Sequence, residues 1–264
     1  EEVIGKNPRI LSSGQQSPEF YKELFDSLKA SDQWQGEVWN RRKDGELYGE
    51  WLTISTVRNK QGQINNHIAI FSDITRRKRK AERNEYLAHH DALTGLGNRL
   101  LLVDRIKSAL LQARRDHKLT AVLYLDLDHF KQINDTLAHD VGDTLLREVA
   151  KRLSACVRGV DSVLRLGGDE FVLVENIRDE NDVKLIANKA LAALAKPFMI
   201  KKHRLYISCS IGICIASSDK AEPLSLVNNA DCAMYQAKHQ GGNCYQFYSE
   251  NVTPLRNPAS GETV

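Results

Sequence analysis

The first part of the chain contains apolar residues at helical spacing. They are followed by stretches in which apolar and polar residues alternate. Residues 17–31 carry apolar side chains about four positions apart, which predicts a short amphipathic helix. The alternating stretches predict three strands, at residues 34–40, 46–57 and 64–71. Turn-forming sequences at residues 43–45 and 59–62 join these strands, so we expect an antiparallel meander with one wetter face.

A highly charged stretch without glycine or proline follows at residues 76–89 and predicts a helix, with Asp73 or Thr75 as its N-cap. Its basic side chains could contact phosphates, but a solvated connecting helix is the commoner explanation of such a run. At 1.5 Å per residue the helix would span roughly 21 Å, enough to connect two domains and carry a twist or shift between them.

From about residue 90 onward, helical and strand-like patterns intermingle. Residues 119–127 form a nearly continuous apolar run that ends in acids, which predicts a buried central strand. Further strands are predicted at residues 162–166, 171–175 and 204–216, and helices at 141–157, 182–195 and 223–239. This order predicts an α/β fold, in the form of an α+β sandwich whose helices cover a mixed sheet.

The composition narrows the class of protein. At roughly 150 residues per domain, 264 residues suggest about two domains. Apolar residues make up 42% and charged residues 27%, as is usual for folded globular proteins. The net charge is only +3, and residues 76–83 alone contain six basic residues and one acidic residue. The slight basicity therefore belongs to the connecting helix, and we expect no nucleic-acid partner.

The sequence shows no sign of a membrane-spanning segment, a secretory leader or a disulfide framework. The longest apolar runs, such as residues 121–125 and 190–195, are far shorter than the ~18 residues of a spanning helix. Glu1 and Glu2 are acidic where a secretory leader is basic. We therefore expect a cytoplasmic chain with no membrane segment, although the full-length protein could be anchored upstream. The five cysteines include no C-x-x-C pair, which favours reduced thiols over disulfides or a zinc site.

Two acids, Asp126 and Asp128, leave the end of the predicted central strand. Their i, i+2 spacing could place both on one face. Carboxylates at the end of a buried strand are costly unless they are paired or bound to a cation, and hard oxygen ligands suit Mg²⁺. A salt-bridged pair of acids is the alternative that this segment leaves open.

A Gly-Gly turn followed by two acids lies between the strands predicted at residues 162–166 and 171–175. Gly167 and Gly168 would let the backbone approach a ligand closely, with Asp169 and Glu170 held on a rigid turn. An ordinary hairpin with exposed acids is the alternative. Together with Asp126, however, these residues put carboxylates on two strands, an arrangement suited to a metal clamp for phosphoryl chemistry.

Polar residues after the central strand could form a nucleotide pocket. Lys131 could meet phosphates beside the amides of a helix start, while Asn134 and Asp143 have the groups needed to read a guanine edge. Singly, each is more often a surface residue. Arg158 and Asp161 would, on spacing alone, form an i, i+3 surface ion pair.

Five motifs in order give the second part of the chain a specific resemblance. Residues 166–171, Leu-Gly-Gly-Asp-Glu-Phe, resemble the signature of the GGDEF family, the diguanylate cyclases. The other four motifs lie at residues 90–99, 126–135, 139–143 and 230–238. The match covers about residues 87–248. It implies a nucleotidyl-cyclase-like fold that condenses two GTP into cyclic di-GMP, a bacterial second messenger, with release of two pyrophosphates.

The resemblance also implies roles for individual residues. Mg²⁺ or Mn²⁺ would be held by Asp126, the carbonyl of Leu127, Asp169 and Glu170, with Asp169 and Glu170 as the catalytic residues and Asp169 as the candidate base. GTP would be bound by Phe130, Lys131, Asn134, His139, Asp143, Gly167, Gly168 and Lys238. Because each domain holds one GTP and the product is symmetric, a homodimer would carry out catalysis.

Two further features bear on regulation. Arg158 and Asp161 resemble the family's inhibitory site, where cyclic di-GMP would bind, so we expect product inhibition. Gly242 stands where the family usually has arginine, and the Gly241–Asn243 form resembles tandem proteins in which an EAL phosphodiesterase domain follows. The alternative function is therefore a regulatory module that binds GTP or cyclic di-GMP and controls a phosphodiesterase domain outside this chain.

The first part of the chain resembles the later half of a PAS domain. The resemblance rests on residues 4–11, 34–37, 42–45 and 71–75. The family's first strands have no counterpart, so we expect a domain truncated at its N-terminus, with an unknown ligand. Pro8 stands where light-sensing relatives carry the adduct-forming cysteine, which argues against flavin photochemistry. The expected organisation is a PAS part at 1–75, a connecting helix at 76–89, a GGDEF domain at 90–250 and a tail at 251–264.

Overall fold

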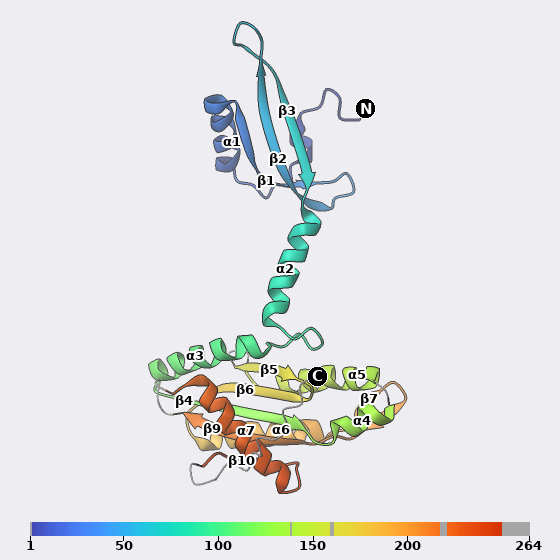
Figure 1. The fold of residues 1–264 in the computed structure, drawn as a ribbon, viewed down its shortest axis with the longest axis vertical. Helices are drawn as coiled ribbons and strands as arrows, with labels where there is room; N and C mark the ends of the chain where they lie inside the picture. The colour runs from blue at the N-terminus through green and yellow to red at the C-terminus, as the bar shows by residue number, and fades with distance from the viewer. Residues whose placement is uncertain (1, 138, 159–160, 217–220, 250–264) are drawn as a thin grey trace, which may run out of the picture. The chain divides into compact units, whose positions relative to one another are not determined.

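The computed structural model describes residues 2–137, 139–158, 161–216 and 221–249. The chain divides into two compact units, one ending at Tyr86 and the other beginning at Leu87 (Figure 1). The expected tail at residues 251–264 lies outside the described residues. In the described part, no helix combines the length and the apolar character that crossing a membrane would require. All five cysteines are free, as expected.

The N-terminal unit is the predicted meander with a helix packed beside it. Its elements are η1 (Pro8–Leu11), α1 (Pro18–Ser31), β1 (Gln33–Arg41), β2 (Leu47–Arg58) and β3 (Ile64–Asp73). The strands lie in the order β1-β2-β3, and both neighbouring pairs are antiparallel. Ser17 caps α1, and Leu24 and Leu28 are buried together with Val38 and Tyr48 of the sheet. The predicted strands and helix are confirmed.

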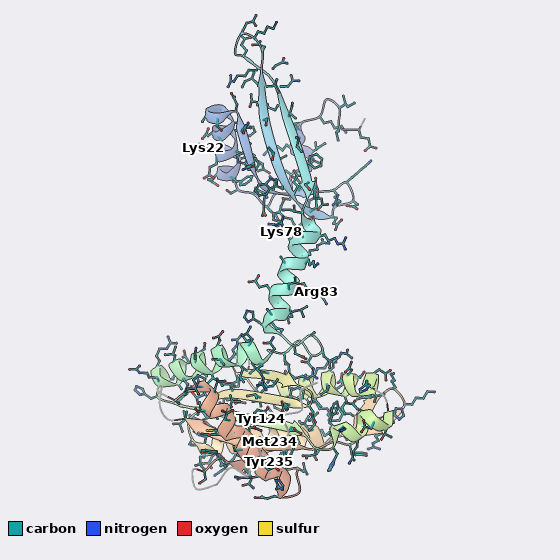
Figure 2. The ribbon with its side chains drawn as sticks, in the orientation of Figure 1. Lys22, Lys78, Arg83, Tyr124, Met234 and Tyr235 are labelled. Atoms are coloured by element: carbon teal, nitrogen blue, oxygen red, sulfur yellow. The ribbon has the colours of Figure 1, made fainter. Side chains whose placement is uncertain are left out.

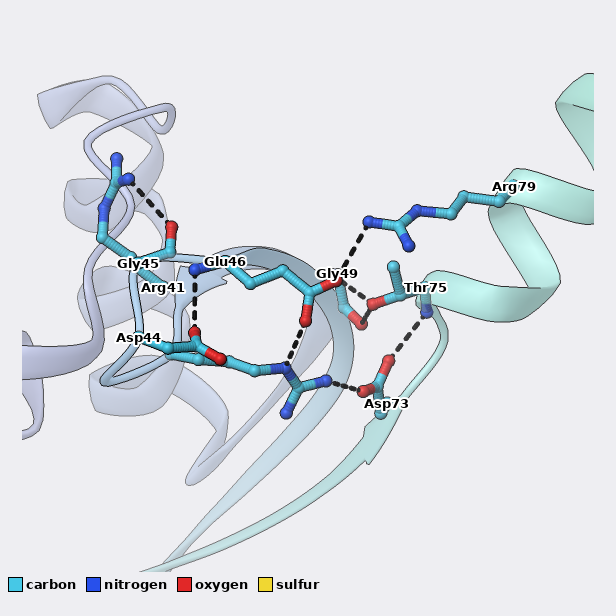
Figure 3. Close-up of polar contacts among 9 residues, drawn as sticks. Arg41, Asp44, Gly45, Glu46, Gly49, Asp73, Thr75 and Arg79 are labelled. Atoms are coloured by element: carbon cyan, nitrogen blue, oxygen red, sulfur yellow. Dashed lines mark hydrogen bonds and ion pairs between the residues drawn. The ribbon is translucent and has the colours of Figure 1, made fainter.

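Helix α2 (Thr75–His89) is anchored to the sheet at its first turn (Figure 3). The Thr75 amide donates to Asp73 Oδ1 at 2.9 Å, and the Thr75 hydroxyl accepts from the Gly49 amide at 3.0 Å. Hydrogen bonds to Asp73 from the Thr75 hydroxyl and amide, together with the Arg42 guanidinium, lower the pKa of Asp73 to about 2. Arg79, one turn further on, pairs with Glu46 at 3.2 Å. Asp73 therefore acts as the expected cap, whereas Thr75 is the first residue of the helix and its hydroxyl bonds to Gly49 of β2.

The C-terminal unit is built on a five-stranded mixed sheet in the order β10-β9-β4-β6-β5. Only β10 runs parallel to its neighbour, which confirms the mixed sheet of the predicted α/β fold. Its elements are α3 (Arg99–Asp116), β4 (Leu119–Leu127), α4 (Phe130–Leu137), α5 (His139–Ser154), β5 (Ser162–Gly167), β6 (Glu170–Ile177), α6 (Glu180–Ala195), β7 (Phe198–Ile200), β8 (His203–Leu205), β9 (Cys209–Ala216), α7 (Pro223–His239) and β10 (Tyr245–Phe247).

Helices cover both faces of this sheet, and the alternation of β4 supplies side chains to each layer. Leu123 and Leu125 pack with α5 and α6 on one face. Val122 and Tyr124 pack with α3 and α7 on the other face. Figure 2 labels Tyr124 of β4 and Met234 of α7, which belong to this layer. The central strand is buried along almost its whole length, as its apolar run predicts.

Two predicted elements need correction. The long strand expected at residues 204–216 is interrupted, because β8 folds back on β7 around Lys201, which has a positive φ of 52°. The carbonyl of Ser208 then accepts from the Asp128 amide at 2.9 Å before β9 begins. The helix expected at 141–157 runs instead from His139 to Ser154, because the Cys156 amide turns back to the Leu153 carbonyl.

Candidate active site

The two predicted groups of carboxylates meet at one end of the central sheet. Asp126, near the end of β4, lies directly opposite Glu170, the first residue of β6, in the antiparallel register. On its other side Asp126 lies opposite Ser210 of β9. Directly opposite residues on neighbouring strands have Cβ atoms about 5 Å apart, so the register brings the two acids together.

The turn between β5 and β6 has a conformation that suits glycine. Gly167 and Gly168 have φ values of +149° and +50°, and a Cβ at either position would meet nothing within 4 Å. Their role is therefore conformational, and it leaves the tip of the turn open to a ligand. Asp169 and Glu170 follow at once and are half-buried. The Asp169 carbonyl accepts from the Leu127 amide at 3.4 Å, which joins the turn to the end of β4.

Asp126 is the most deeply buried acid of this group, at 8% exposure. Lys238 of α7 places its Nζ 2.7 Å from Asp126 Oδ1. Burial nevertheless raises the pKa of Asp126 to about 6, with further contributions from the charges of Asp169 and Glu170 and an opposing one from Lys238. Burial and the charge of Glu170 also raise the pKa of Tyr124, which lies beneath them in β4. The charges that act on Asp126 are thus the two carboxylates of Asp169 and Glu170 against the single ammonium of Lys238.

This donor set suits a hard divalent cation whose coordination is completed by other oxygens. Among the described residues, no three His, Cys, Asp or Glu side chains are grouped so that they could hold a metal ion by themselves. Mg²⁺, however, usually binds one or two protein carboxylates and fills its remaining positions with water and substrate phosphates. Asp126 and Glu170, with the carbonyl of Leu127 beside them, match that pattern.

Asp128 has a different role from Asp126. Its carboxylate accepts from the Ser208 hydroxyl at 2.6 Å, the Ser210 hydroxyl at 2.7 Å and the Asn243 amide at 3.0 Å. These bonds hold the loop after α7 against the start of β9. The sequence reasoning missed this role, because it depends on partners far along the chain.

Gly242 lies against this carboxylate. It has a φ of +74°, and a Cβ at this position would lie 2.9 Å from Asp128 Oδ2 and 3.0 Å from Asp128 Cγ. The departure from the family's arginine thus has a local physical reason, since both the backbone conformation and the space favour glycine.

The residues expected to read guanine lie where α4 and α5 pack closely. Asn134 Oδ1 is buried and has no hydrogen-bond partner among the described residues. A Cβ on Gly142 of α5 would lie only 1.8 Å from that oxygen, so this glycine leaves room for the Asn134 side chain. Asp143, His139 and Lys131 are exposed. The Phe130 side chain is buried in the core at 6% exposure.

The expected inhibitory pair lies between α5 and β5. The Arg158 amide donates to Asp161 Oδ2 at 3.2 Å, and the Asp161 amide donates to the Arg158 carbonyl at 3.0 Å. The carboxylate thus accepts from the backbone of Arg158, and the Arg158 residue is exposed. This arrangement differs from the surface ion pair that spacing alone suggests.

Both units match families of known proteins. Residues 88–244 match the family model described as diguanylate cyclase, GGDEF domain. Residues 1–76 match a PAS domain model. Among curated proteins, the bifunctional diguanylate cyclase/cyclic di-GMP phosphodiesterase MucR of Pseudomonas aeruginosa is 47% identical over 166 residues, which are 63% of this chain and 24% of MucR. The chain spans about a quarter of the length of the first curated relatives that it matches.

Solved structures resemble the C-terminal unit. The GGDEF domain of TpbB from Pseudomonas aeruginosa is 36% identical with a TM-score of 0.57, and the match covers 61% of this chain and 95% of that one. The GGDEF domain of DgcB from Caulobacter crescentus, solved in complex with c-di-GMP, is 26% identical with a TM-score of 0.57. That match covers 61% of this chain and 94% of the DgcB domain.

Proposed function

We propose, from the premise that this chain belongs to the GGDEF family of diguanylate cyclases, that it condenses two GTP into cyclic di-GMP and two pyrophosphates. The observation that carries the proposal is the meeting of Asp126 and Glu170 in register at the end of the sheet, beside Lys238 and next to the intact Gly-Gly turn. The surplus of negative charge there suits a bound divalent cation and the phosphates that it would bring.

In the proposed reaction, the 3′-hydroxyl oxygen of one GTP attacks the α-phosphorus of the other. The bond to the β-phosphate breaks, pyrophosphate leaves, and the hydroxyl proton passes to the carboxylate of Asp169. The second half-reaction repeats this step with the roles of the nucleotides exchanged. A divalent cation, Mg²⁺ or Mn²⁺, held by Asp126, the Leu127 carbonyl, Asp169 and Glu170, would neutralise charge that develops on the phosphates.

The remaining predicted residues would bind and orient GTP. Lys131 and Lys238 would meet the triphosphate, and Gly167 and Gly168 would let it approach the backbone. The unpartnered Asn134 oxygen supports a role in accepting from the guanine edge, alongside Asp143 and His139. The Phe130 side chain is in the core, so its contribution to the pocket would come through packing against Gly142. Two such domains would face each other in a homodimer.

Regulation would involve the N-terminal unit and the connection between α5 and β5. Residues 1–75 would be the PAS sensor, with an unidentified ligand, and residues 76–89 the connecting helix to a GGDEF domain at 90–250. Arg158 and Asp161 would bind cyclic di-GMP and inhibit the enzyme. The substrate GTP suggests a cytoplasmic reaction.

The second candidate function is a module that binds GTP or cyclic di-GMP and controls a phosphodiesterase domain, such as an EAL domain. It is supported by the bifunctional name of MucR, of which this chain spans 24%.

Incubation with GTP and Mg²⁺ or Mn²⁺, followed by chromatography of the dinucleotide, tests the proposal. Dimeric wild-type protein is expected to form cyclic di-GMP, and Asp169→Ala is expected to lose this activity while it still binds GTP. If a demonstrated dimer binds GTP but forms no cyclic di-GMP, the regulatory-module function replaces the cyclase. Asp104→Asn, at an exposed acid on α3 outside the five motifs, is the matched control.

A further inference from the structure

One buried acid in the C-terminal unit has no part in the proposed reaction. Glu175, near the end of β6, is 4% exposed, and its Oε1 has no hydrogen-bond partner among the described residues. By the alternation of the strand it lies on the same face as Leu173 and Ile177, both in the apolar layer under α5 and α6. A carboxylate in such surroundings is costly unless something compensates for its burial.

The position of Glu175 links it to the expected inhibitory pair. Ser162 of β5 lies opposite Val174 of β6, so Asp161 and Glu175 are the next residues along the two strands. The charges that act on Glu175 come from Asp161, Arg158 and Lys189. Glu175 therefore adjoins the site proposed for cyclic di-GMP, although no recognised motif includes it.

The charged groups that act on Glu175 come from two segments. Asp161 and Arg158 belong to the connection between α5 and β5, and Lys189 belongs to α6. The Lys189 ammonium donates to the Cys156 carbonyl at 2.9 Å, which keeps it at the end of α5. Burial raises the pKa of the Cys156 thiol, so this side chain stays neutral in the physiological range. The net charge of this group is +1 when Glu175 is neutral, because Arg158 and Lys189 are positive and Asp161 is negative. It is zero when Glu175 is ionised.

We propose that Glu175 is a proton-controlled charge beside the cyclic di-GMP site: its neutral carboxyl permits tight binding of the dianionic dinucleotide, and its ionised form weakens that binding. The inference rests on the proposed role of Arg158 and Asp161 in product binding. Burial and the charge of Asp161 raise the pKa of Glu175 to about 8, against the opposing effects of Arg158 and Lys189. The change of charge thus falls between neutral and mildly alkaline pH. Product inhibition becomes weaker as pH rises through this range.

Binding of cyclic di-GMP to the intact chain, measured by calorimetry from pH 6.5 to 8.5, tests the inference. A unit charge about 10 Å from a phosphate, at an effective dielectric constant near 20, corresponds to roughly a tenfold change in affinity. Because a carboxyl with a pKa of about 8 is only partly ionised at pH 8.5, wild-type affinity is expected to fall about threefold over the range, whereas the affinity of Glu175→Gln stays constant. In buffers of different ionisation enthalpy, wild-type protein is expected to take up a fraction of a proton on binding near pH 8.

Arg158→Ala separates this inference from the proposal on which it rests. If Arg158→Ala binds cyclic di-GMP as well as wild type does, the inhibitory site itself is wrong. If Arg158→Ala abolishes binding but Glu175→Gln keeps the wild-type pH dependence, the inhibitory site stands and the role of Glu175 is wrong. Proton uptake by the wild type needs no variant, so an absence of uptake near pH 8 would also overturn the role of Glu175, whether or not Glu175→Gln folds.

Discussion

The guanidinium of Arg165 donates to the carbonyl oxygen of Gly168 from both Nε and Nη2, at 3.0 and 2.7 Å. Its Nη1 lies 2.8 Å from Asp91 Oδ1, and the Arg165 side chain is only 9% exposed. Because Asp169 and Glu170 directly follow Gly168, this buried cation holds the turn that positions both acids. Asp91 is itself tied down, since it accepts from the amide and the hydroxyl of Thr94.

Arg165→Met should therefore reduce kcat at least tenfold and lower the free energy of unfolding by about 2–4 kcal/mol, because a buried ion pair loses one partner. Steady-state kinetics and chemical unfolding would measure the two effects. Asp91→Asn is the matched control, since an amide oxygen can still accept from Arg165 and Thr94, and its effects should be smaller. A kcat for Arg165→Met within twofold of wild type would show that the turn keeps its position without the cation.

Restoring the family's arginine at residue 242 should not improve the enzyme. A side chain at a φ of +74° costs about 1–2 kcal/mol, and this one would start 2.9 Å from the Asp128 carboxylate. Gly242→Arg is expected to lower the free energy of unfolding by at least that amount and to leave the KM for GTP no lower. Gly242→Ala imposes the same backbone strain without the charge. If Gly242→Arg binds GTP several times more tightly than Gly242→Ala, the missing arginine does limit nucleotide affinity.

Gly142→Ala should act on GTP binding through Asn134. The new Cβ would lie 1.8 Å from Asn134 Oδ1, and the flexible amide can move where backbone could not. We expect folding to be retained and the KM for GTP to rise roughly tenfold, as for the loss of one hydrogen bond to a base edge, with little change in kcat. The double variant Asn134→Ala/Gly142→Ala should match Asn134→Ala alone. Additive effects of the two changes would place the action of Gly142 elsewhere.

The sequence predicts elements with a strong local pattern better than it predicts contacts between distant segments. The apolar run of β4 and the alternation of β1 to β3 are local, and both are confirmed. The break between β8 and β9 is not visible locally, because it depends on the bond from the Asp128 amide to Ser208. The same limit applies to the candidate site. The motifs indicate its acids, but only the register shows that Asp126 faces Glu170.

Glu175 shows this limit most clearly, since its sequence position at the end of a strand gives no sign that the carboxyl is buried in an apolar layer. Its pKa of about 8 in the fold lies above the ordinary 4.5. Between these values the unfolded chain has released the proton while the folded chain keeps it, so the free energy of unfolding must fall as pH rises from about 4.5 to about 8. Below this window Glu175 is protonated in both the folded and the unfolded chain. Above it Glu175 is ionised in both, so the free-energy cost of burying its charge no longer changes with pH.

Glu175→Gln removes the titrating group and keeps its shape. Relative to wild type, its free energy of unfolding should be higher by about 1–3 kcal/mol at pH 9 and nearly unchanged at pH 4.5, because only the ionised carboxylate is penalised by burial. Equilibrium urea unfolding at several pH values, followed by a probe in the C-terminal unit, measures this difference. Glu180→Gln, at an acid of α6 whose side chain is 63% exposed, should follow the wild-type profile. A constant difference between Glu175→Gln and wild type across the pH range would mean that Glu175 keeps one charge state throughout, and that the fold compensates for it.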